Sequence, residues 1–87
     1  MKYYKCKWNE LRDDQFDDWG FSLWYLEIGD DDYPNRQIQI YENGKKLKYS
    51  QDYLDDKYGG LSDQKLYQSE FGGIECSKAE FENNWNN

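Results

Sequence analysis

Aromatic side chains constrain the fold of this chain most strongly, because they supply most of the apolar surface that it can bury. The 87 residues include four Trp, nine Tyr and four Phe, against seven Leu, four Ile and no Val. So few aliphatic residues, with a mean hydropathy of −1.29, are typical of a disordered chain. Each aromatic, however, buries on the order of 150 to 250 Å² and has few rotatable bonds. We therefore expect a folded domain with an aromatic core.

The length predicts a single domain over residues 1–87, because an average domain uses roughly 100 to 150 residues. A domain of this size buries only about 60 to 65% of its unfolded surface. We expect several aromatics to stay partly exposed, and we do not expect a large catalytic cavity.

The charge of the chain favours a basic partner. Lys and Arg number 11 against 18 Asp and Glu, which gives a net charge of −7. This balance argues against direct binding of nucleic acid or of an anionic membrane. The first eight residues lack the apolar core of an export signal, and no stretch approaches the ~18 apolar residues of a membrane span. A cytoplasmic location is expected, with Cys6 and Cys76 reduced.

Alternation of apolar and polar residues predicts four strands of an antiparallel meander. Both faces of the second strand are apolar, which is typical of a central strand that is covered on two sides or that meets a partner. In the third strand, Ile38 and Ile40 are predicted to point inward and Gln37, Gln39 and Tyr41 outward. In the fourth, Leu47 and Tyr49 are predicted to point inward. The four segments are Lys2–Trp8, Phe21–Ile28, Arg36–Glu42 and Lys45–Ser50.

Turn and cap residues predict how these strands connect and where a helix begins. Gly29–Asn35 is rich in turn residues and predicts a long hairpin loop, and Asn43-Gly44 predicts a type I′ turn. Residues 51–71 are expected to be loop with short helical turns, and residues 72–76 an edge strand. Ser77 and Glu80 match a capping box that opens a C-terminal helix, whose Phe81 and Trp85 form one apolar stripe. The predicted fold class is α+β: an antiparallel four- to five-stranded sheet with the helix packed on one face.

Catalytic chemistry is restricted by what the chain lacks. It contains no His and no Thr, so Ser-His and Cys-His nucleophile pairs and imidazole metal ligands cannot occur. Gly59-Gly60 and Gly72-Gly73 lack the spacing of a phosphate-binding loop. Asp30, Asp31 and Asp32 lack the alternating pattern of a calcium loop. We expect a protein that is not an enzyme and that uses no cofactor and no metal.

Two clusters place acids beside an aromatic residue and form the candidate partner-binding site. Protein interfaces favour Trp and Tyr anchors in a polar rim, and clustered carboxylates steer a basic partner. Alternatively, the acids only keep the protein soluble while the aromatics contribute to the core. A third possibility is that the partner meets the sheet face that carries Trp24 and Tyr41. The candidate residues are Asp13, Asp14, Asp17, Asp18 and Trp19 in one cluster and Asp30, Asp31, Asp32 and Tyr33 in the other.

The sequence resembles a family of small uncharacterised bacterial domains. The resemblance lies in the opening Lys2, Tyr3, Lys5, Lys7 and Trp8, in the hairpin WYLEIGDDDYPNRQIQIYENGK, and in the closing Ser77–Glu82 and Trp85. Members of this kind of family are similar to immunity proteins of bacterial toxin systems, including contact-dependent growth inhibition, which bind and block a cognate toxin. The resemblance implies an α+β fold and a toxin partner, and it assigns no site residue.

These observations favour an immunity protein that occludes the active site of a cognate basic toxin. A nuclease toxin has to be basic to hold phosphate, so an acidic inhibitor would compete directly with its substrate. One alternative is an acidic nucleic-acid mimic of phage origin, of the anti-CRISPR or anti-restriction type. Another is a structural domain that forms a homodimer through an aromatic face. The expected oligomeric state is a monomer or a weak homodimer.

Overall fold

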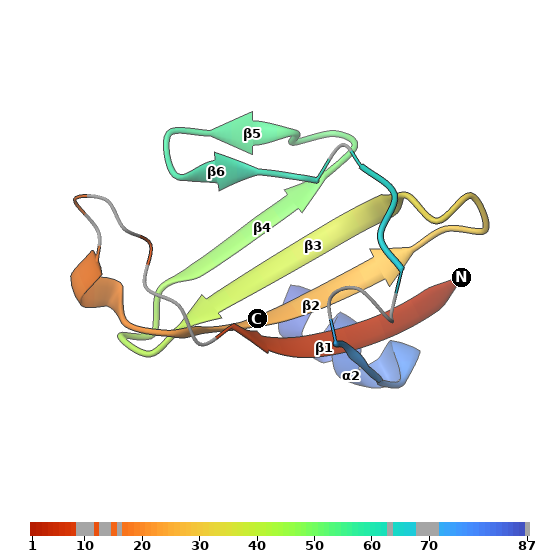
Figure 1. Ribbon diagram of the computed structural model, residues 1–87, viewed down its shortest axis with the longest axis horizontal. Coiled ribbons are helices and arrows are strands. Elements are labelled where there is room, and N and C mark those ends of the chain that lie inside the picture. Colours follow the sequence, from red (N-terminus) through yellow and green to blue (C-terminus); the bar gives the residue numbers. More distant parts are fainter. Residues whose placement is uncertain (9–11, 13–14, 16, 63, 68–71, 87) are drawn as a thin grey trace.

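An antiparallel sheet forms the centre of the molecule (Figure 1). The computed structural model describes residues 1–8, 12, 15, 17–62, 64–67 and 72–86. In these residues the main sheet has five strands in the order β4-β3-β2-β1-β7. The strands are β1 Lys2–Trp8, β2 Ser22–Ile28, β3 Pro34–Tyr41, β4 Lys46–Ser50 and β7 Ile74–Glu75. The predicted meander and the predicted edge strand are both confirmed.

The hairpins that join these strands lie where the turn residues place them. The β2–β3 loop is closed by a hydrogen bond from Gly29 N to Tyr33 O at 3.0 Å, and Asp32 adopts a positive φ of 68° within it. The predicted type I′ turn after β3 is wrong, because Gly44 has a φ of 90° and Asn43 does not have a positive φ. Instead, Gly44 N donates to Tyr41 O and Tyr41 N to Lys45 O, each at 2.9 Å. This is a three-residue loop with a glycine bulge, in which one positive φ is sufficient.

The C-terminal helix α2, Lys78–Trp85, covers one face of the sheet. Ser77 caps it as predicted, since the Ser77 hydroxyl accepts from Glu80 N at 3.1 Å. The Glu80 carboxylate does not return to the cap, because it accepts hydrogen bonds from Lys5 and Tyr25 on the sheet. Phe81 and Trp85 stack with ring centroids 6.2 Å apart and form the predicted apolar stripe. Phe81 packs with Tyr25 and Ile38 into a cluster of buried side chains.

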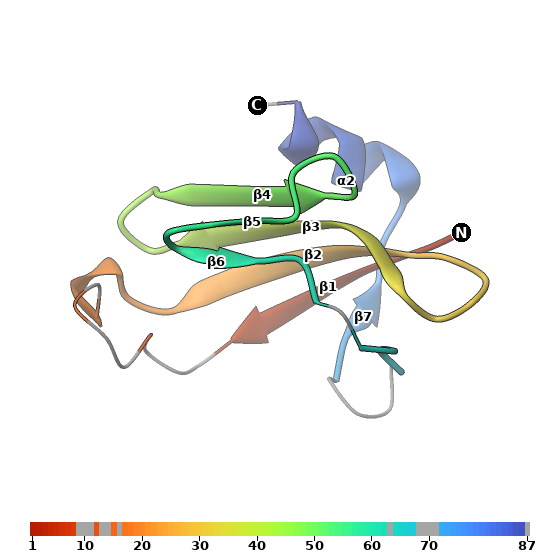
Figure 2. The ribbon, with the colours of Figure 1, turned by 90° about the horizontal axis from the view of Figure 1, so that it is seen from above.

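The opposite face of the sheet is covered by the chain that follows β4 (Figure 2). The predicted short helical turns are wrong for the described residues between 51 and 67, which instead contain a two-stranded hairpin of β5 Asp55–Asp56 and β6 Gly59–Gly60. The remainder of the segment predicted as loop, residues 63 and 68–71, lies outside the described residues. Leu61 and Tyr58 pack against buried Tyr41, Leu47 and Tyr49, and Leu66 packs against buried Tyr4, Leu26 and Ile28. The molecule therefore has two cores, one on each face.

Two cores explain why the predicted orientation of β3 is wrong. Gln37, Gln39 and Tyr41 were expected to face outward, but their exposed fractions are 1%, 5% and 6%. The register places Ile38 opposite Lys48, and Gln39 opposite Leu47. The predicted inward residues of β3 and of β4 therefore lie on opposite faces, and each set meets its own core. The apolar character of β2 on both sides agrees with this arrangement, as predicted.

The two cysteines lie on opposite faces of the sheet edge. Cys6 shares its face with Tyr4, whereas Cys76 packs with Tyr25 and Phe81 under α2. Both are free thiols, and burial raises the pKa of each. The cysteines therefore behave as small half-buried side chains.

Among the described residues, no helix is long and apolar enough to cross a membrane.

Candidate protein-binding surfaces

The first acid and aromatic cluster is held at one end of the sheet by the 3-10 helix η1, Asp17–Trp19. Asp18 is exposed. Trp19 is half-buried, and its indole packs against the rings of Tyr41 and Tyr58, each at a centroid distance of 5.2 Å. Trp19 therefore contributes to the core, as one alternative in the sequence analysis proposed. Asp13 and Asp14 lie outside the described residues, and only the backbone of Asp17 is described.

Two cations cover the Trp19 ring. The Arg12 guanidinium lies 5.1 Å from the ring centroid and the Lys45 ammonium 5.6 Å from it. Arg12 also donates to the Tyr41 hydroxyl at 3.0 Å and to the Tyr58 carbonyl. The Arg12 and Lys45 cations therefore lie over an aromatic face, which attracts them through its quadrupole.

The second cluster occupies the β2–β3 loop. The Asp30 side chain is fully exposed, with the terminal amine of Met1 3.9 Å from its carboxylate, and Asp31 is also exposed. The Asp31 carboxylate accepts from Tyr33 N at 3.1 Å. Tyr33 is 39% exposed, and the Lys65 ammonium lies 5.8 Å from its ring centroid. Asp30, Asp31 and Tyr33 therefore present polar and aromatic groups together at the loop surface, whereas Asp32 is half-buried.

The two clusters do not form one compact surface. Figure 1 shows η1 and the β2–β3 loop at opposite ends of the long axis of the molecule, which extends 35 Å. A partner that contacts both would have to cover the whole length of the sheet. The described residues of the two clusters therefore belong to two separate surfaces.

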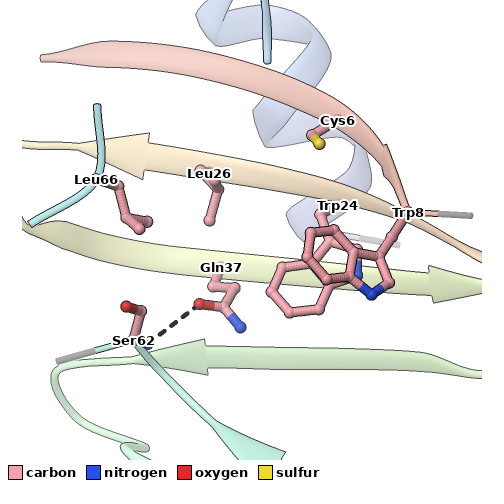
Figure 3. A pocket seen from close by; sticks show the side chains of 7 residues that line it. All are labelled: Cys6, Trp8, Trp24, Leu26, Gln37, Ser62 and Leu66. Atoms are coloured by element: carbon pink, nitrogen blue, oxygen red, sulfur yellow. Dashed lines mark hydrogen bonds between the residues drawn. The ribbon is translucent and has the colours of Figure 1, made fainter. Parts of the chain in front are cut away.

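A pocket of about 200 Å³ lies between these ends, on the face opposite α2 (Figure 3). Trp8 and Trp24 form one wall, with ring centroids 5.6 Å apart. Leu26 and Gln37 form the floor, and Ser62 and Leu66 lie across from the indoles. Cys6 borders the pocket from β1. Trp8 is 42% exposed, so the wall that it forms is accessible from outside.

Two polar side chains at this pocket, those of Gln37 and Trp24, are hydrogen-bonded within the protein. The Gln37 side chain donates to Gly60 O and accepts from Ser62 N, each at 3.2 Å. The Trp24 indole donates to the Ser22 hydroxyl at 2.8 Å. The two Gln37 bonds hold the covering segment in place, and the pocket is lined mainly by carbon.

A second and more open hollow, of about 550 Å³, lies along the β5–β6 hairpin and shares Ser62 with the pocket. It is lined by the exposed Leu54 and by Asp55 and Asp56. The Asp56 carboxylate accepts from the Tyr49 and Tyr53 hydroxyls and from Tyr58 N. Partial burial opposes ionisation of Asp56, but these hydrogen bonds outweigh it and hold its pKa below the ordinary value. The Asp56 carboxylate is therefore charged at neutral pH.

Only some of the residues that line the pocket could be predicted from the sequence. The alternation of β1 and β2 places Trp8 and Trp24 on predictable faces, and Trp24 was singled out as an alternative contact. Its predicted companion Tyr41 lies on the same sheet face, but it is buried among Leu47 and Tyr49. Ser62 and Leu66 carry no local signal for a pocket, because their place depends on hydrogen bonds to distant residues.

Within the described residues, no group of three or more Cys, Asp or Glu side chains is arranged to hold a metal ion. Comparisons of the chain with protein-family models, with curated proteins and with solved structures found no match.

Proposed function

We propose that this protein is an inhibitor that binds and covers the basic active-site surface of a toxin protein, foremost a nuclease, in the cytoplasm. The proposal treats it as an immunity protein, in line with the family that its sequence resembles. The protein contributes charge and shape, and the inhibition is steric.

The observation that carries this proposal is how the charges are distributed. Several cations are engaged within the molecule: Arg36 bonds Glu27 and Glu82, and Lys5 bonds Glu80. Others lie over the protein's own aromatic rings, namely Arg12, Lys45, Lys57 and Lys65. Of these four, Lys45, Lys57 and Lys65 are exposed. Acids at the loops and on the hairpin are exposed as well, namely Asp18, Asp30, Asp31, Asp52 and Asp55. With a net charge of −7, the outer surface presents carboxylates to a partner.

Such a surface would match the substrate groove of a nuclease. That groove carries Lys and Arg to hold phosphates, and carboxylates on a rigid scaffold can take the same positions. The attraction between the two proteins would also speed their encounter at low ionic strength. Competition for the groove then explains inhibition without any chemistry in the inhibitor.

The experiment that tests this function is capture followed by an activity assay. The tagged protein is used to retain proteins from a lysate of the source cells at low salt, and the retained fraction is eluted at high salt. We expect the eluate to hydrolyse RNA or DNA, and we expect added protein to stop the hydrolysis at low salt. An eluate whose nuclease activity is unaffected by the added protein would overturn the proposal.

Two other results would replace the proposal with an alternative. Recovery of a restriction or CRISPR complex would indicate a nucleic-acid mimic, and recovery of the chain alone would indicate a homodimer. The charge contribution is tested with Asp30→Lys combined with Asp31→Lys, against a control that carries Asp30→Asn and Asp31→Asn. We expect association to slow more in the Lys variant than in the control. Equal rates for both variants would place the interface away from the β2–β3 loop.

A further inference from the structure

The Trp8 and Trp24 pocket has the size and lining of a site for one side chain. Its volume of about 200 Å³ exceeds the roughly 150 Å³ that accommodates a benzene ring in an apolar protein cavity. The Gln37 amide and the Trp24 indole N–H are bonded inside the protein, so water in the pocket would find few partners. An apolar group that displaces such water gains affinity. The pocket therefore favours an aromatic or branched aliphatic occupant.

The acidic residues of the neighbouring hollow indicate which side chains should flank the occupant in the partner. Ser62 lines both depressions, and Asp55 and Asp56 line the second one. A chain that crosses Ser62 can place an apolar side chain in the pocket and a neighbouring side chain against these acids. Lys and Arg are the complementary neighbours, because the acids attract them and repel acidic segments. Anionic lipids and nucleic acids are repelled in the same way.

We propose that this pocket receives one aromatic or aliphatic side chain from a basic segment of the partner protein, while the Lys or Arg neighbours of that side chain lie against Asp55 and Asp56. The basic character of the partner rests on the function proposed above. The occupied pocket would be the energetic centre of the interface, since a buried anchor packed against Trp side chains is typical of a hot spot. The exposed acids of the β2–β3 loop, Asp30 and Asp31, would then steer the partner toward it.

The test uses short basic peptides and NMR of the isotopically labelled full chain. The probes are the pentapeptides Lys-Lys-Phe-Lys-Lys, Lys-Lys-Ser-Lys-Lys and Glu-Glu-Phe-Glu-Glu, each blocked at both ends. We expect the basic Phe peptide to shift the indole N–H resonances of Trp8 and Trp24. We expect the basic Ser peptide to bind at least about tenfold more weakly, because it buries no apolar side chain. The acidic Phe peptide should also bind more weakly.

Two variants locate the effect. Trp8→Ala removes the exposed half of the wall that Trp8 and Trp24 form. It should abolish the preferential binding of the basic Phe peptide over the basic Ser peptide. Phe21→Ala is the matched control, since Phe21 is 39% exposed, close to the 42% of Trp8, and does not line the pocket. If Trp8→Ala fails to fold, Ser62→Phe fills the pocket from its rim and should have the same effect. The Ser62 amide that bonds Gln37 is retained in that variant.

Equal affinity for the basic Phe and Ser peptides would overturn the proposal that the pocket receives an apolar side chain. An unchanged preference for the Phe peptide in Trp8→Ala would overturn it as well. Equal affinity for the basic and acidic Phe peptides would overturn the role of Asp55 and Asp56. These outcomes are separate from those of the capture experiment. A Phe preference in a protein that inhibits no captured nuclease would overturn only the function proposed above. Equal inhibition of a captured nuclease by Trp8→Ala and by the original chain would overturn only the pocket.

Discussion

Glu27 is a charged residue in the interior of this molecule, and its partners define a first prediction. Only 5% of the residue is exposed, and its carboxylate accepts from Arg36 through two nitrogens, at 2.9 and 2.6 Å, and from the Tyr3 hydroxyl at 2.8 Å. Replacement by Gln keeps the shape but removes the charge. Hydrogen bonds to charged groups contribute about 1.5 to 3 kcal/mol each, so we expect Glu27→Gln to lower the free energy of unfolding by about that amount. Urea unfolding followed by Trp fluorescence measures it.

The same residue predicts a pH dependence. Hydrogen bonds from Arg36 outweigh the effect of burial and hold the pKa of Glu27 below its ordinary value of 4.5. A carboxyl whose pKa is lower in the folded state stabilises the protein above the unfolded pKa, and this contribution is lost as the pH falls through the folded pKa. The loss of stability below pH 4.5 should therefore be smaller in Glu27→Gln than in the original chain. Identical pH profiles, with the exposed Glu75→Gln as control, would contradict this account.

At the scale of the elements, two glycines with positive φ allow the cost of backbone strain to be distinguished from the cost of a steric clash when each is replaced by alanine. Gly44 in the β3–β4 loop has a φ of 90° and open space where a Cβ would lie, whereas Gly20 before β2 has a φ of 85° and a Cβ position 2.7 Å from Glu42 Oε1. We expect Gly44→Ala to cost about 1 kcal/mol of unfolding free energy, from backbone conformation alone. Gly20→Ala should cost more, because Glu42 must move and its bond to Phe21 N is lost. Equal losses in thermal unfolding would contradict the steric contribution.

The elements also show which parts of the fold local patterns can predict. Alternation located β1, β2, β3 and β4, because each has at least one apolar face. It predicted the wrong buried face for β3, because Gln37 and Gln39 are polar residues whose side-chain amides form hydrogen bonds inside the protein and are buried. The β5–β6 hairpin was missed for a related reason: Asp55 and Asp56 resemble solvated loop, and the hairpin is stabilised by the phenols of Tyr49 and Tyr53, which bond Asp56.

The candidate site was predictable to a similar extent. Alternation places Trp8 and Trp24 on one face once β1 and β2 are paired, and the register of Cys6 with Trp24 brings the two indoles into diagonal contact. The facing wall could not be predicted. Leu66 is placed by the bond of its amide to Asp32 O at 2.9 Å, a contact between segments distant in sequence.

At the scale of the whole molecule, the excess of negative charge predicts a salt dependence of stability. The molecule measures 35 × 26 × 25 Å, so at about 0.01 M salt, where the Debye length is about 30 Å, its excess negative charges repel one another across the whole molecule. At about 0.15 M salt the Debye length is about 8 Å, and this repulsion is screened. We expect the midpoint of thermal unfolding to rise over this range. The rise should be smaller in a variant with Asp30→Asn and Asp31→Asn.

The opposite result has a defined meaning. A midpoint that falls as salt is added would show that screening of the ion pairs made by Arg36 and Lys5 outweighs the relief of repulsion. The variant with Asp30→Asn and Asp31→Asn would then behave like the original chain, because those residues take no part in these pairs.

The bond between Gln37 and the segment above it has a consequence for how this protein can diverge. The Gln37 amide holds the covering segment through two main-chain atoms, Gly60 O and Ser62 N. Any residue except proline at position 62 offers the same amide, so the attachment survives most changes of side chain there. Descendants of this sequence can therefore vary the exposed residues of the cover while the sheet and helix keep their sequence. Selection for a new partner can then change the rim of the pocket at position 62 while Trp8, Trp24 and the rest of the sheet stay unchanged.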